Sequence, residues 1–243
     1  MKLSKLPTGE PEIFYTIQGE GVSMGKPALF MRLSLCNLHC SWCDTPYTWN
    51  WEDTPWQTTE GKKYSKADQI ITLSVEELLP KLQSYPCTHL VITGGEPLIQ
   101  QKELAQLISA LPSAWTFEVE TNGTIIPDAF PSRASIQYNV SPKLSHSGNP
   151  RNLALNPESL MWLRMQKHAY FKFVISQPSD LTEVQAIQRE HNIPASQIIL
   201  MPKGTNSSTI QSEALNIVNL CLEHGYRYSD RLHVHLWGNE RAK

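Results

Sequence analysis

The sequence predicts an α/β fold in which parallel strands alternate with helices in a single domain. Short apolar segments alternate with amphipathic ones along most of the chain, which is the pattern of βα units around a parallel sheet. A chain of 243 residues can build one sizeable core, so one large domain is favoured over two. Polar and glycine-rich motifs follow directly after several predicted strands, as functional loops do at the carboxyl end of a parallel barrel.

The predicted elements follow in regular order. After an extended segment at 12–17 and a glycine turn at 19–21, the apolar run 28–35 is predicted to be the first barrel strand. Ser74 and Glu77 form a capping box that starts a helix running toward Tyr85. Further strands are expected at 89–93, 115–120, 135–140, 170–175, 197–201 and 232–237, and further helices at 100–111, 157–166, 180–191 and 209–224.

Composition excludes several classes of function. Lys and Arg number 21 against 23 Asp and Glu, so no basic field favours nucleic acid. The N-terminus lacks an apolar core of signal-peptide length, and no uninterrupted apolar run approaches the ~20 residues that span a bilayer. We therefore expect a cytoplasmic protein without membrane or nucleic-acid partners.

Three of the five cysteines, Cys36, Cys40 and Cys43, are spaced C-x3-C-x2-C directly after the first predicted barrel strand. This grouping argues against a disulfide framework, and Cys87 and Cys221 are expected in or near the core. Three thiolates leave one coordination position free, as in a 4Fe–4S cluster whose fourth iron binds a substrate or cofactor. A structural zinc site needs four ligands, and no clean second pair lies nearby. A zinc-binding module remains the alternative from a different class.

Charged residues also occur inside apolar strands. Arg32 in the first barrel strand is costly unless it pairs with an anion, and a guanidinium binds a carboxylate best. That carboxylate belongs either to a substrate or to an acidic residue of the protein. Glu118 and Glu120 share one face of their strand, which indicates a polar barrel interior or, alternatively, a solvated sheet edge.

The segment 46–72 is the least regular part of the chain and contains Trp49, Trp51 and Trp56. We interpret it as an insertion that packs over the cysteine loop rather than as a separate domain. Its tryptophans could equally form a dimer contact.

With Trp42 before its last cysteine, the loop resembles the signature of radical S-adenosylmethionine (SAM) enzymes. The resemblance runs from about residue 10 to the C-terminus, and further motifs occur in the order seen in the 7-carboxy-7-deazaguanine synthase family of the queuosine pathway. These motifs are Thr-Ile-Gln-Gly-Glu-Gly at 16–21, Phe-Met-Arg-Leu at 30–33, Trp-Cys-Asp-Thr at 42–45, Thr-Gly-Gly-Glu-Pro at 93–97, Glu-Thr-Asn-Gly-Thr at 120–124 and Ser-Pro-Lys at 141–143.

This resemblance implies a partial (β/α)6-type radical SAM barrel and a carbon–nitrogen lyase. The lyase would convert 6-carboxy-5,6,7,8-tetrahydropterin to 7-carboxy-7-deazaguanine with loss of ammonia, after a 5′-deoxyadenosyl radical has taken a hydrogen from C6 of the pterin. The alternative is a glycyl-radical-enzyme activase, which would share the cysteine loop but act on a protein.

The resemblance also implies cofactors, partners and residue roles. The cofactors are a [4Fe–4S] cluster, SAM and Mg²⁺; the partners are a small pterin substrate, a flavodoxin- or ferredoxin-like reductant and a second copy in a homodimer. Thr45 would bind Mg²⁺, unless it serves only as a helix N-cap. No catalytic residue is implied beyond the SAM-derived radical. The residues implied for SAM are Trp42, Asp44, Gly95, Glu96, Asn122, Ser141, Pro142, Lys143, Met201, Pro202, Lys203 and Gly204. Those implied for the substrate are Ile17, Gln18, Gly19, Glu20, Arg32, Thr93 and His233.

Two features depart from the family pattern. Ser34 and Leu35 precede the first cysteine, where many members have a glycine. The tail 238–243 extends past the point where some relatives place a substrate-binding C-terminal carboxylate, so that role is not assigned here. His233 and His235 alternate on the last predicted strand and are expected to share a face.

Overall fold

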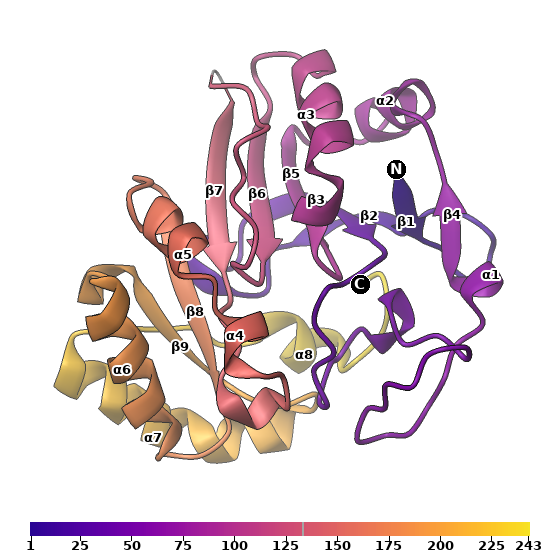
Figure 1. The fold of residues 1–243 in the computed structure, drawn as a ribbon. Coiled ribbons are helices and arrows are strands. Elements are labelled where there is room, and N and C mark those ends of the chain that lie inside the picture. The colour runs from indigo at the N-terminus through magenta and orange to yellow at the C-terminus, as the bar shows by residue number, and fades with distance from the viewer. Residues whose placement is uncertain (133) are drawn as a thin grey trace.

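The computed structural model describes residues 1–132 and 134–243, and its main feature is a mostly parallel sheet with helices packed against it (Figure 1). The strands are β1 (Lys2–Ser4), β2 (Ile13–Ile17), β3 (Pro27–Leu33), β4 (Ile70–Thr72), β5 (His89–Gly94), β6 (Thr116–Thr121), β7 (Ser135–Val140), β8 (Ala169–Ile175), β9 (Ile198–Pro202) and β10 (Arg227–Tyr228). The helices are α1 (Lys66–Gln69), α2 (Val75–Gln83), α3 (Gln101–Ala110), α4 (Arg151–Ala154), α5 (Pro157–Arg164), α6 (Asp180–His191), α7 (Ser207–His224) and α8 (Leu232–Trp237).

The sheet has the order β10-β9-β8-β7-β6-β5-β3-β1-β4, with β2 paired to β3. The strands from β3 through β5, β6, β7 and β8 to β9 pair in parallel with their neighbours in chain order. Pairing in chain order through helical connections is also the arrangement found along the wall of a βα barrel. The predicted α/β fold is therefore confirmed, and antiparallel β1, β2 and β4 extend the sheet beside β3.

The core lies between the sheet and the helices that cover it. Leu78 and Leu82 of α2, Leu104 and Leu107 of α3 and Val184 of α6 belong to one buried cluster with the strand residues. The capping box predicted at Ser74 and Glu77 is present, with both reciprocal hydrogen bonds. The apolar faces of the helices thus hold the barrel wall from outside and leave the carboxyl ends of the strands free for loops. No helix in the described parts of the chain has the length and apolarity needed to cross a membrane.

The strand predicted at 232–237 is wrong, because these residues form the short helix α8. Leu232, Val234 and Leu236 alternate as in a strand, but only Val234 is buried, and Leu236 remains 53% exposed. The parallel edge next to β9 is occupied instead by β10, at Arg227–Tyr228.

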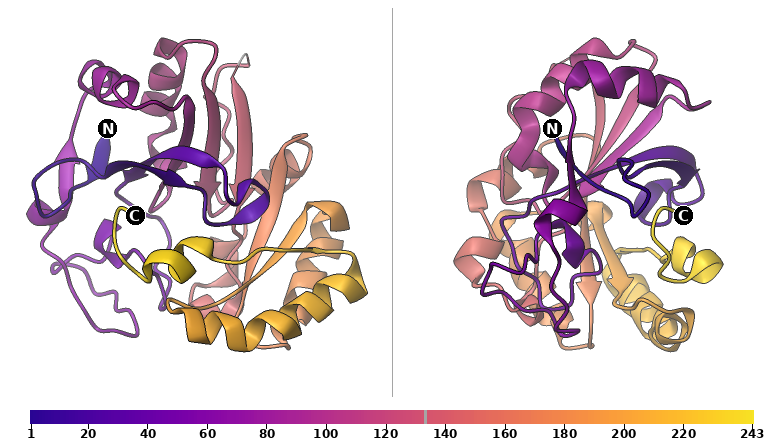
Figure 2. Two further views of the ribbon diagram at one scale, coloured as in Figure 1. Left: turned by 180° about the vertical axis from the view of Figure 1, so that it is seen from behind. Right: turned by 90° about the vertical axis from the view of Figure 1, so that its right-hand side faces the viewer.

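As a consequence, His233 and His235 do not share a face. Residues two apart on a helix point about 200° away from each other. His233 lies 3.9 Å from Glu20, whereas His235 contacts Ser207 through Nδ1 and Asp230 through Nε2. Helix α8 and the C-terminal end lie on the same side of the sheet as β2 (Figure 2), and the Leu232 amide donates to the Gly19 carbonyl.

Candidate active site

A cavity of about 560 Å³ lies where the carboxyl ends of the parallel strands meet the cysteine loop. This size is typical of a small-molecule site. Of the residues expected at the site, the cavity is lined by Ile17, Gln18, Gly19, Glu20, Arg32, Cys36, Cys40, Trp42, Cys43, Asp44, Thr45, Thr93, Gly95, Asn122, Ser141, Lys143, Met201, Pro202, Lys203, Gly204 and His233. Glu96 and Pro142 are buried outside its lining.

The three clustered cysteines all border this cavity and form no disulfide. Two of their sulfur atoms accept hydrogen bonds: Asn149 Nδ2 donates to Cys40 at 3.2 Å, and Trp49 Nε1 donates to Cys43 at 3.3 Å. Hydrogen bonds to the sulfurs are one way in which a protein supports an iron–sulfur cluster. The donor set of the loop therefore fits such a cluster.

The arrangement of the thiols is compatible with a cluster. Within residues 1–132 and 134–243, no group of three or more His, Cys, Asp or Glu side chains converges as one ion requires. In a 4Fe–4S cube, each thiolate binds a different iron, so convergence on one point is unnecessary. Burial, with a contribution from Asp44, raises the pKa of Cys43 to about 11, so this thiol must lose its proton when it binds metal.

The tryptophan-containing segment packs against the cysteine loop. Trp56 stacks on His39 with 3.9 Å between ring centroids, and Trp49 contacts the edge of the same imidazole. The Thr59 amide donates to the Ser41 carbonyl at 2.7 Å. The imidazole of His39 is therefore held by aromatic rings, as expected for a residue that is not a ligand.

The Gly94–Gly95 pair fits tightly against the chain that enters the cysteine loop. A Cβ atom at Gly95 would lie 2.1 Å from the Leu35 carbonyl oxygen and 3.0 Å from Cys36 Cβ. The Glu96 amide donates to the same Leu35 carbonyl at 2.8 Å. Position 95 must be glycine because two backbone segments approach each other there. A ligand that approaches from the cavity would add a second reason.

Glu96 acts as an internal anchor. Its fully buried carboxylate accepts hydrogen bonds from the Thr121 hydroxyl and from the backbone amides of Leu98 and Asn122. Burial raises the pKa of Glu96 above its usual value. The side chain therefore joins the ends of β5 and β6 and does not reach the cavity.

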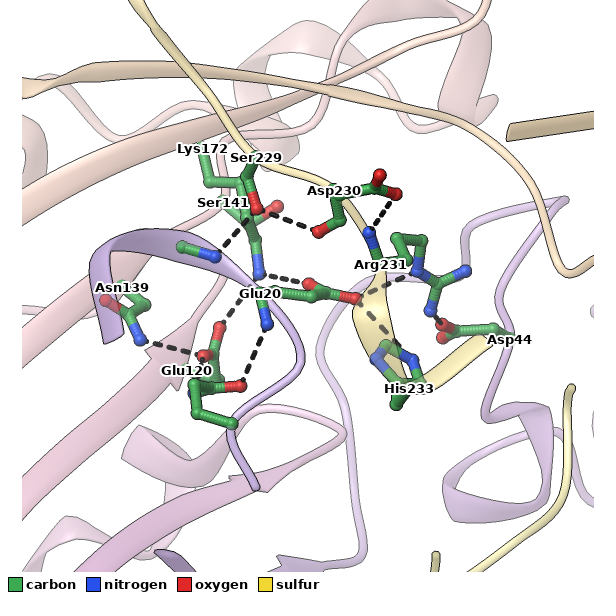
Figure 3. A network of polar contacts seen from close by, with 12 residues as sticks. Glu20, Asp44, Glu120, Asn139, Ser141, Lys172, Ser229, Asp230, Arg231 and His233 are labelled. Carbon is green, nitrogen blue, oxygen red and sulfur yellow. Dashed lines mark hydrogen bonds and ion pairs between the residues drawn. The ribbon is translucent and has the colours of Figure 1, made fainter. Parts of the chain in front are cut away.

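A network of buried charges forms one wall of the cavity (Figure 3). Lys172 donates to Glu20 at 2.6 Å and to Glu120 at 3.1 Å. Burial alone would lower the pKa of Lys172, but the two carboxylates raise it, so the ammonium stays charged. Burial alone would raise the pKa of Glu20, but Lys172 and Arg231 hold it well below its usual value. Glu20 is thus an ionised carboxylate at the cavity.

Arg231 joins three separate parts of the site. Its guanidinium donates to Glu20 at 2.9 Å, to Asp44 at 2.5 Å and to the carbonyl of Gly204 at 2.5 Å. Asp44, which the resemblance assigns to SAM, thus has an oxygen engaged by a protein cation. Arg231 fixes the glutamate loop, the cysteine loop and the segment after β9 relative to one another.

Sequence reasoning missed Arg231 and Lys172. Lys172 has a usable signal, because it is a single cation within the apolar strand β8, and the argument applied to Arg32 applies equally to it. Arg231 has no such signal, since it lies in a polar connection between β10 and α8.

The sequence predicts that Arg32 pairs either with a substrate carboxylate or with an acidic residue of the protein. Its Nε donates to the fully buried carboxylate of Glu12 at 2.8 Å, so an ion pair with a protein acid is present. Within the described residues, this is the hydrogen bond that the guanidinium makes, and Arg32 also lines the cavity. The terminal amino groups are therefore available for a ligand.

Trp42 lies between two lysines. Lys143 Nζ is 5.9 Å and Lys203 Nζ is 5.6 Å from the Trp42 ring centroid, both within the range of cation–π attraction. Lys143 also donates to Ser141 at 2.8 Å. An anionic group beside this indole would meet two ammonium groups.

Thr45 occupies the N-cap position of a short 3-10 helix at Pro46–Thr48, but its side chain makes no capping hydrogen bond. Its hydroxyl lies 3.8 Å from Cys43 Sγ and borders the cavity. Capping is therefore not what this hydroxyl does in the structure.

The predicted polar interior of the barrel is confirmed. Glu118 is buried and accepts hydrogen bonds from Gln18 and Asn139, while its other oxygen contacts His89. Burial alone would raise the pKa of Glu118, but the interactions with His89, Ser23 and Gln18 lower it to about 2. The solvated-edge alternative does not apply.

The chain is similar in sequence and in fold to known proteins. Residues 33–134 match the family model of the radical SAM superfamily. The chain is 35% identical to a 7-carboxy-7-deazaguanine synthase of Pyrobaculum aerophilum, over 96% of each chain. It is 34% identical to one of Halobacterium salinarum, over 94% of this chain and 90% of the relative. The crystal structure of QueE from Escherichia coli superposes with a TM-score of 0.63 at 26% identity, covering 96% of this chain and 95% of that one.

The fold and the cysteine-lined cavity are thus those of a radical SAM protein, and this class implies SAM and a 4Fe–4S cluster as cofactors. Within the class, the chain belongs to the 7-carboxy-7-deazaguanine synthase family.

The close approach at Gly95 gives the first prediction. Gly95→Ala should push the Leu35 carbonyl and Cys36 away and prevent cluster assembly while the barrel stays folded. Iron content and visible absorbance after anaerobic reconstitution measure the cluster, and circular dichroism measures the fold. Gly9→Ala is the control, because a Cβ there has positive-φ strain but no neighbour within 4 Å. Normal iron content in Gly95→Ala would contradict this account.

Proposed function

We propose that the protein converts 6-carboxy-5,6,7,8-tetrahydropterin to 7-carboxy-7-deazaguanine with loss of ammonia, as a carbon–nitrogen lyase of the radical SAM class. The observation that carries this proposal is a single cavity bordered by the three clustered cysteines, Gly95 and the Glu20–Arg32 side. Such a cavity allows a cofactor and a small substrate to be held next to each other, which is the main contribution of a protein to cofactor chemistry.

Cys36, Cys40 and Cys43 would hold the cluster, with Asn149 and Trp49 donating to two of the sulfurs. With SAM bound, a reduced cluster held by these thiolates would supply the 5′-deoxyadenosyl radical needed for hydrogen abstraction at C6 of the pterin. The protein would position the substrate for this step. The segment 46–72, which packs over the cysteine loop, would limit the access of water.

SAM would lie beside the carboxyl ends of β5, β6, β7 and β9. Gly95, Asn122 and Ser141 would contact its methionine end, and Trp42 with residues 201–204 would flank the adenine. Lys143 and Lys203 supply positive charge next to Trp42. Glu96 would act indirectly, since its bonds to Leu98, Thr121 and Asn122 fix the shape of the neighbouring loops.

The pterin would occupy the side of the cavity formed by β2, β3 and α8. Arg32 would bind its carboxylate, and the Gln18–Glu20 loop, Thr93 and His233 would contact the ring system. The ionised Glu20 is suited to accept hydrogen bonds from the amino and ring N–H groups of a pterin.

Thr45 would bind Mg²⁺ together with the substrate carboxylate. Mg²⁺ retains few protein ligands and accepts substrate oxygens, so one neutral hydroxyl and a carboxylate suit it. The Thr45 hydroxyl borders the cavity and makes no capping hydrogen bond, which supports this proposal.

The remaining expectations stay predictions, the first two by analogy with the family and the others from the sequence. They are the flavodoxin- or ferredoxin-like reductant, the homodimer, the cytoplasmic location, the absence of nucleic-acid and membrane partners, and the description of the chain as one domain with an insertion at 46–72.

Anaerobic turnover of the reconstituted protein tests the proposed function. The assay contains SAM, Mg²⁺, reductant and 6-carboxytetrahydropterin, and product mass is followed. We expect the deazaguanine to form without proportional consumption of SAM. Slow cleavage of SAM with the pterin intact would overturn the substrate assignment and favour the activase. A colourless anaerobic preparation would favour zinc.

Arg32→Ala should raise the KM for the pterin by about 10- to 100-fold, because a hydrogen-bonded charge contact contributes roughly 1.5–3 kcal/mol. SAM cleavage without substrate should be unchanged, since Arg32 lies on the Glu12 side of the cavity. Steady-state kinetics and SAM-cleavage assays measure the two effects. An unchanged KM would exclude Arg32 as the carboxylate ligand.

Thr45→Ala should lower turnover by about tenfold and remove its dependence on Mg²⁺, while iron content stays normal. The assay is a Mg²⁺ titration of turnover, with Thr54→Ala as control because that hydroxyl bonds a backbone carbonyl within the insertion. A Thr45→Ala enzyme with an unaltered Mg²⁺ response would disprove the assignment.

A further inference from the structure

The C-terminal segment after α8 runs along the cavity, beside the N-terminal strands. Gly238, at φ 66°, turns the chain, and residues 239–243 then line the cavity wall. Figures 1 and 2 show this end of the chain beside the N-terminal strands. No role for residues 239–243 follows from the sequence alone.

Arg241 is the residue that attaches it. Its guanidinium donates to Glu12 at 2.8 Å, to the Ser4 hydroxyl at 2.6 Å, to the Lys5 carbonyl at 2.9 Å and to Gln69 at 3.2 Å. The same group lies 3.8 Å above the centroid of the Tyr47 ring, in cation–π contact. Arg241 is thus held by several specific contacts, whereas a charge that is merely exposed at the surface makes few of them.

Glu12 is shared between two arginines. The carboxylate is fully buried; its Oε1 accepts from Arg32 Nε at 2.8 Å and its Oε2 accepts from Arg241 Nε at 2.8 Å. Burial alone would raise the pKa of Glu12, but Arg32 and Arg241 lower it overall, so the group is ionised. Two guanidinium groups therefore share one carboxylate beside the cavity.

The division of the two oxygens has a consequence for Arg32. An arginine and a carboxylate prefer a bidentate pair with two parallel hydrogen bonds. Arg32 makes one hydrogen bond to Glu12, through Nε, while Arg241 Nε occupies the second oxygen of Glu12. If Arg241 were absent, Arg32 could pair with both oxygens, and less of its guanidinium would be available to a ligand.

We propose that Arg241 is a positioning residue for substrate recognition: it holds Glu12 Oε2 and thereby keeps the terminal amino groups of Arg32 available for the carboxylate of the pterin. The inference rests on the proposed function, in which Arg32 binds that carboxylate. It adds a specificity determinant that lies outside the substrate contacts and acts through a shared anion.

Equilibrium binding tests this directly. The probes are two fluorescent oxidised pterins, 6-carboxypterin and pterin without the carboxyl group, titrated into the reconstituted protein with SAM and Mg²⁺. The wild-type protein should prefer 6-carboxypterin by at least about tenfold. Arg241→Gln should reduce this preference toward one, with the affinity for the unsubstituted pterin, the iron content and the SAM affinity unchanged. In turnover, KM should rise while kcat changes little.

A second variant separates positioning of Arg32 from loss of the cavity wall. In Arg241→Gln/Glu12→Gln, the tail is still released, but Arg32 no longer has the Glu12 carboxylate to pair with. The preference for 6-carboxypterin should therefore recover by at least about threefold relative to Arg241→Gln alone. Arg151→Gln is the matched control, because that guanidinium pairs with Glu190 at the surface, where both side chains are 51% exposed. The control should leave both affinities unchanged.

Three results would overturn the inference: an unchanged preference in Arg241→Gln, an equal loss of affinity for both pterins, or no recovery in the double variant. These differ from failure of the proposed function. If the wild-type protein itself does not prefer the carboxylated pterin, the substrate role of Arg32 fails, and the role of Arg241 fails with it. If it does prefer that pterin, but Arg241→Gln has no effect, only the role of Arg241 fails.

Discussion

The geometry of the site depends on one buried guanidinium. The Arg231 side chain is 9% exposed and donates to Glu20, which follows β2, and to Asp44 in the cysteine loop (Figure 3). It also donates to the carbonyl of Gly204, which follows β9. A buried cation needs partners in several directions, since its desolvation is costly unless its donors are paired. The three segments are therefore fixed together by the requirement of a single side chain.

The same requirement explains the position of α8. Arg231 directly precedes this helix, and the Leu232 amide bonds the Gly19 carbonyl, so the helix begins where the guanidinium is anchored. His233 then lies against Gly19, where a Cβ atom would be 2.1 Å from its Nδ1. The absence of a side chain at Gly19 is what allows α8 to close over the glutamate loop.

Charge pairing organises the rest of the cavity in the same way. Lys172 bridges Glu20 and Glu120, and Glu12 bridges Arg32 and Arg241, so each buried ion serves two partners of opposite charge. Shared ions of this kind set the orientation of side chains more sharply than isolated pairs, because each partner limits the positions of the other. The cavity is consequently lined by charges held in fixed positions before any ligand binds.

The sequence by itself determined the features that are local in the chain. The cysteine spacing, the capping box at Ser74, the strands β3, β5, β6, β7, β8 and β9 and the glycine pair at 94–95 each depend on residues within about one element, where periodicity and residue type are informative. The location of the motifs at one site followed from the predicted strands, because the loops after parallel strands meet at one edge of the sheet. Lys172 could also have been found, as a cation in an apolar strand.

Only the tertiary structure decided the pairings and the last element. Arg231 and Glu20 are 211 residues apart, and Arg241 and Glu12 are 229 apart, and no pattern within a segment identifies such partners. The alternation at 232–237 resembled a strand, but β10 already takes the edge of β9, and the anchored Arg231 starts a helix instead. Local periodicity does not show which edge of the sheet is unpaired or which residues form ion pairs in the core, because both depend on the packing of the whole chain.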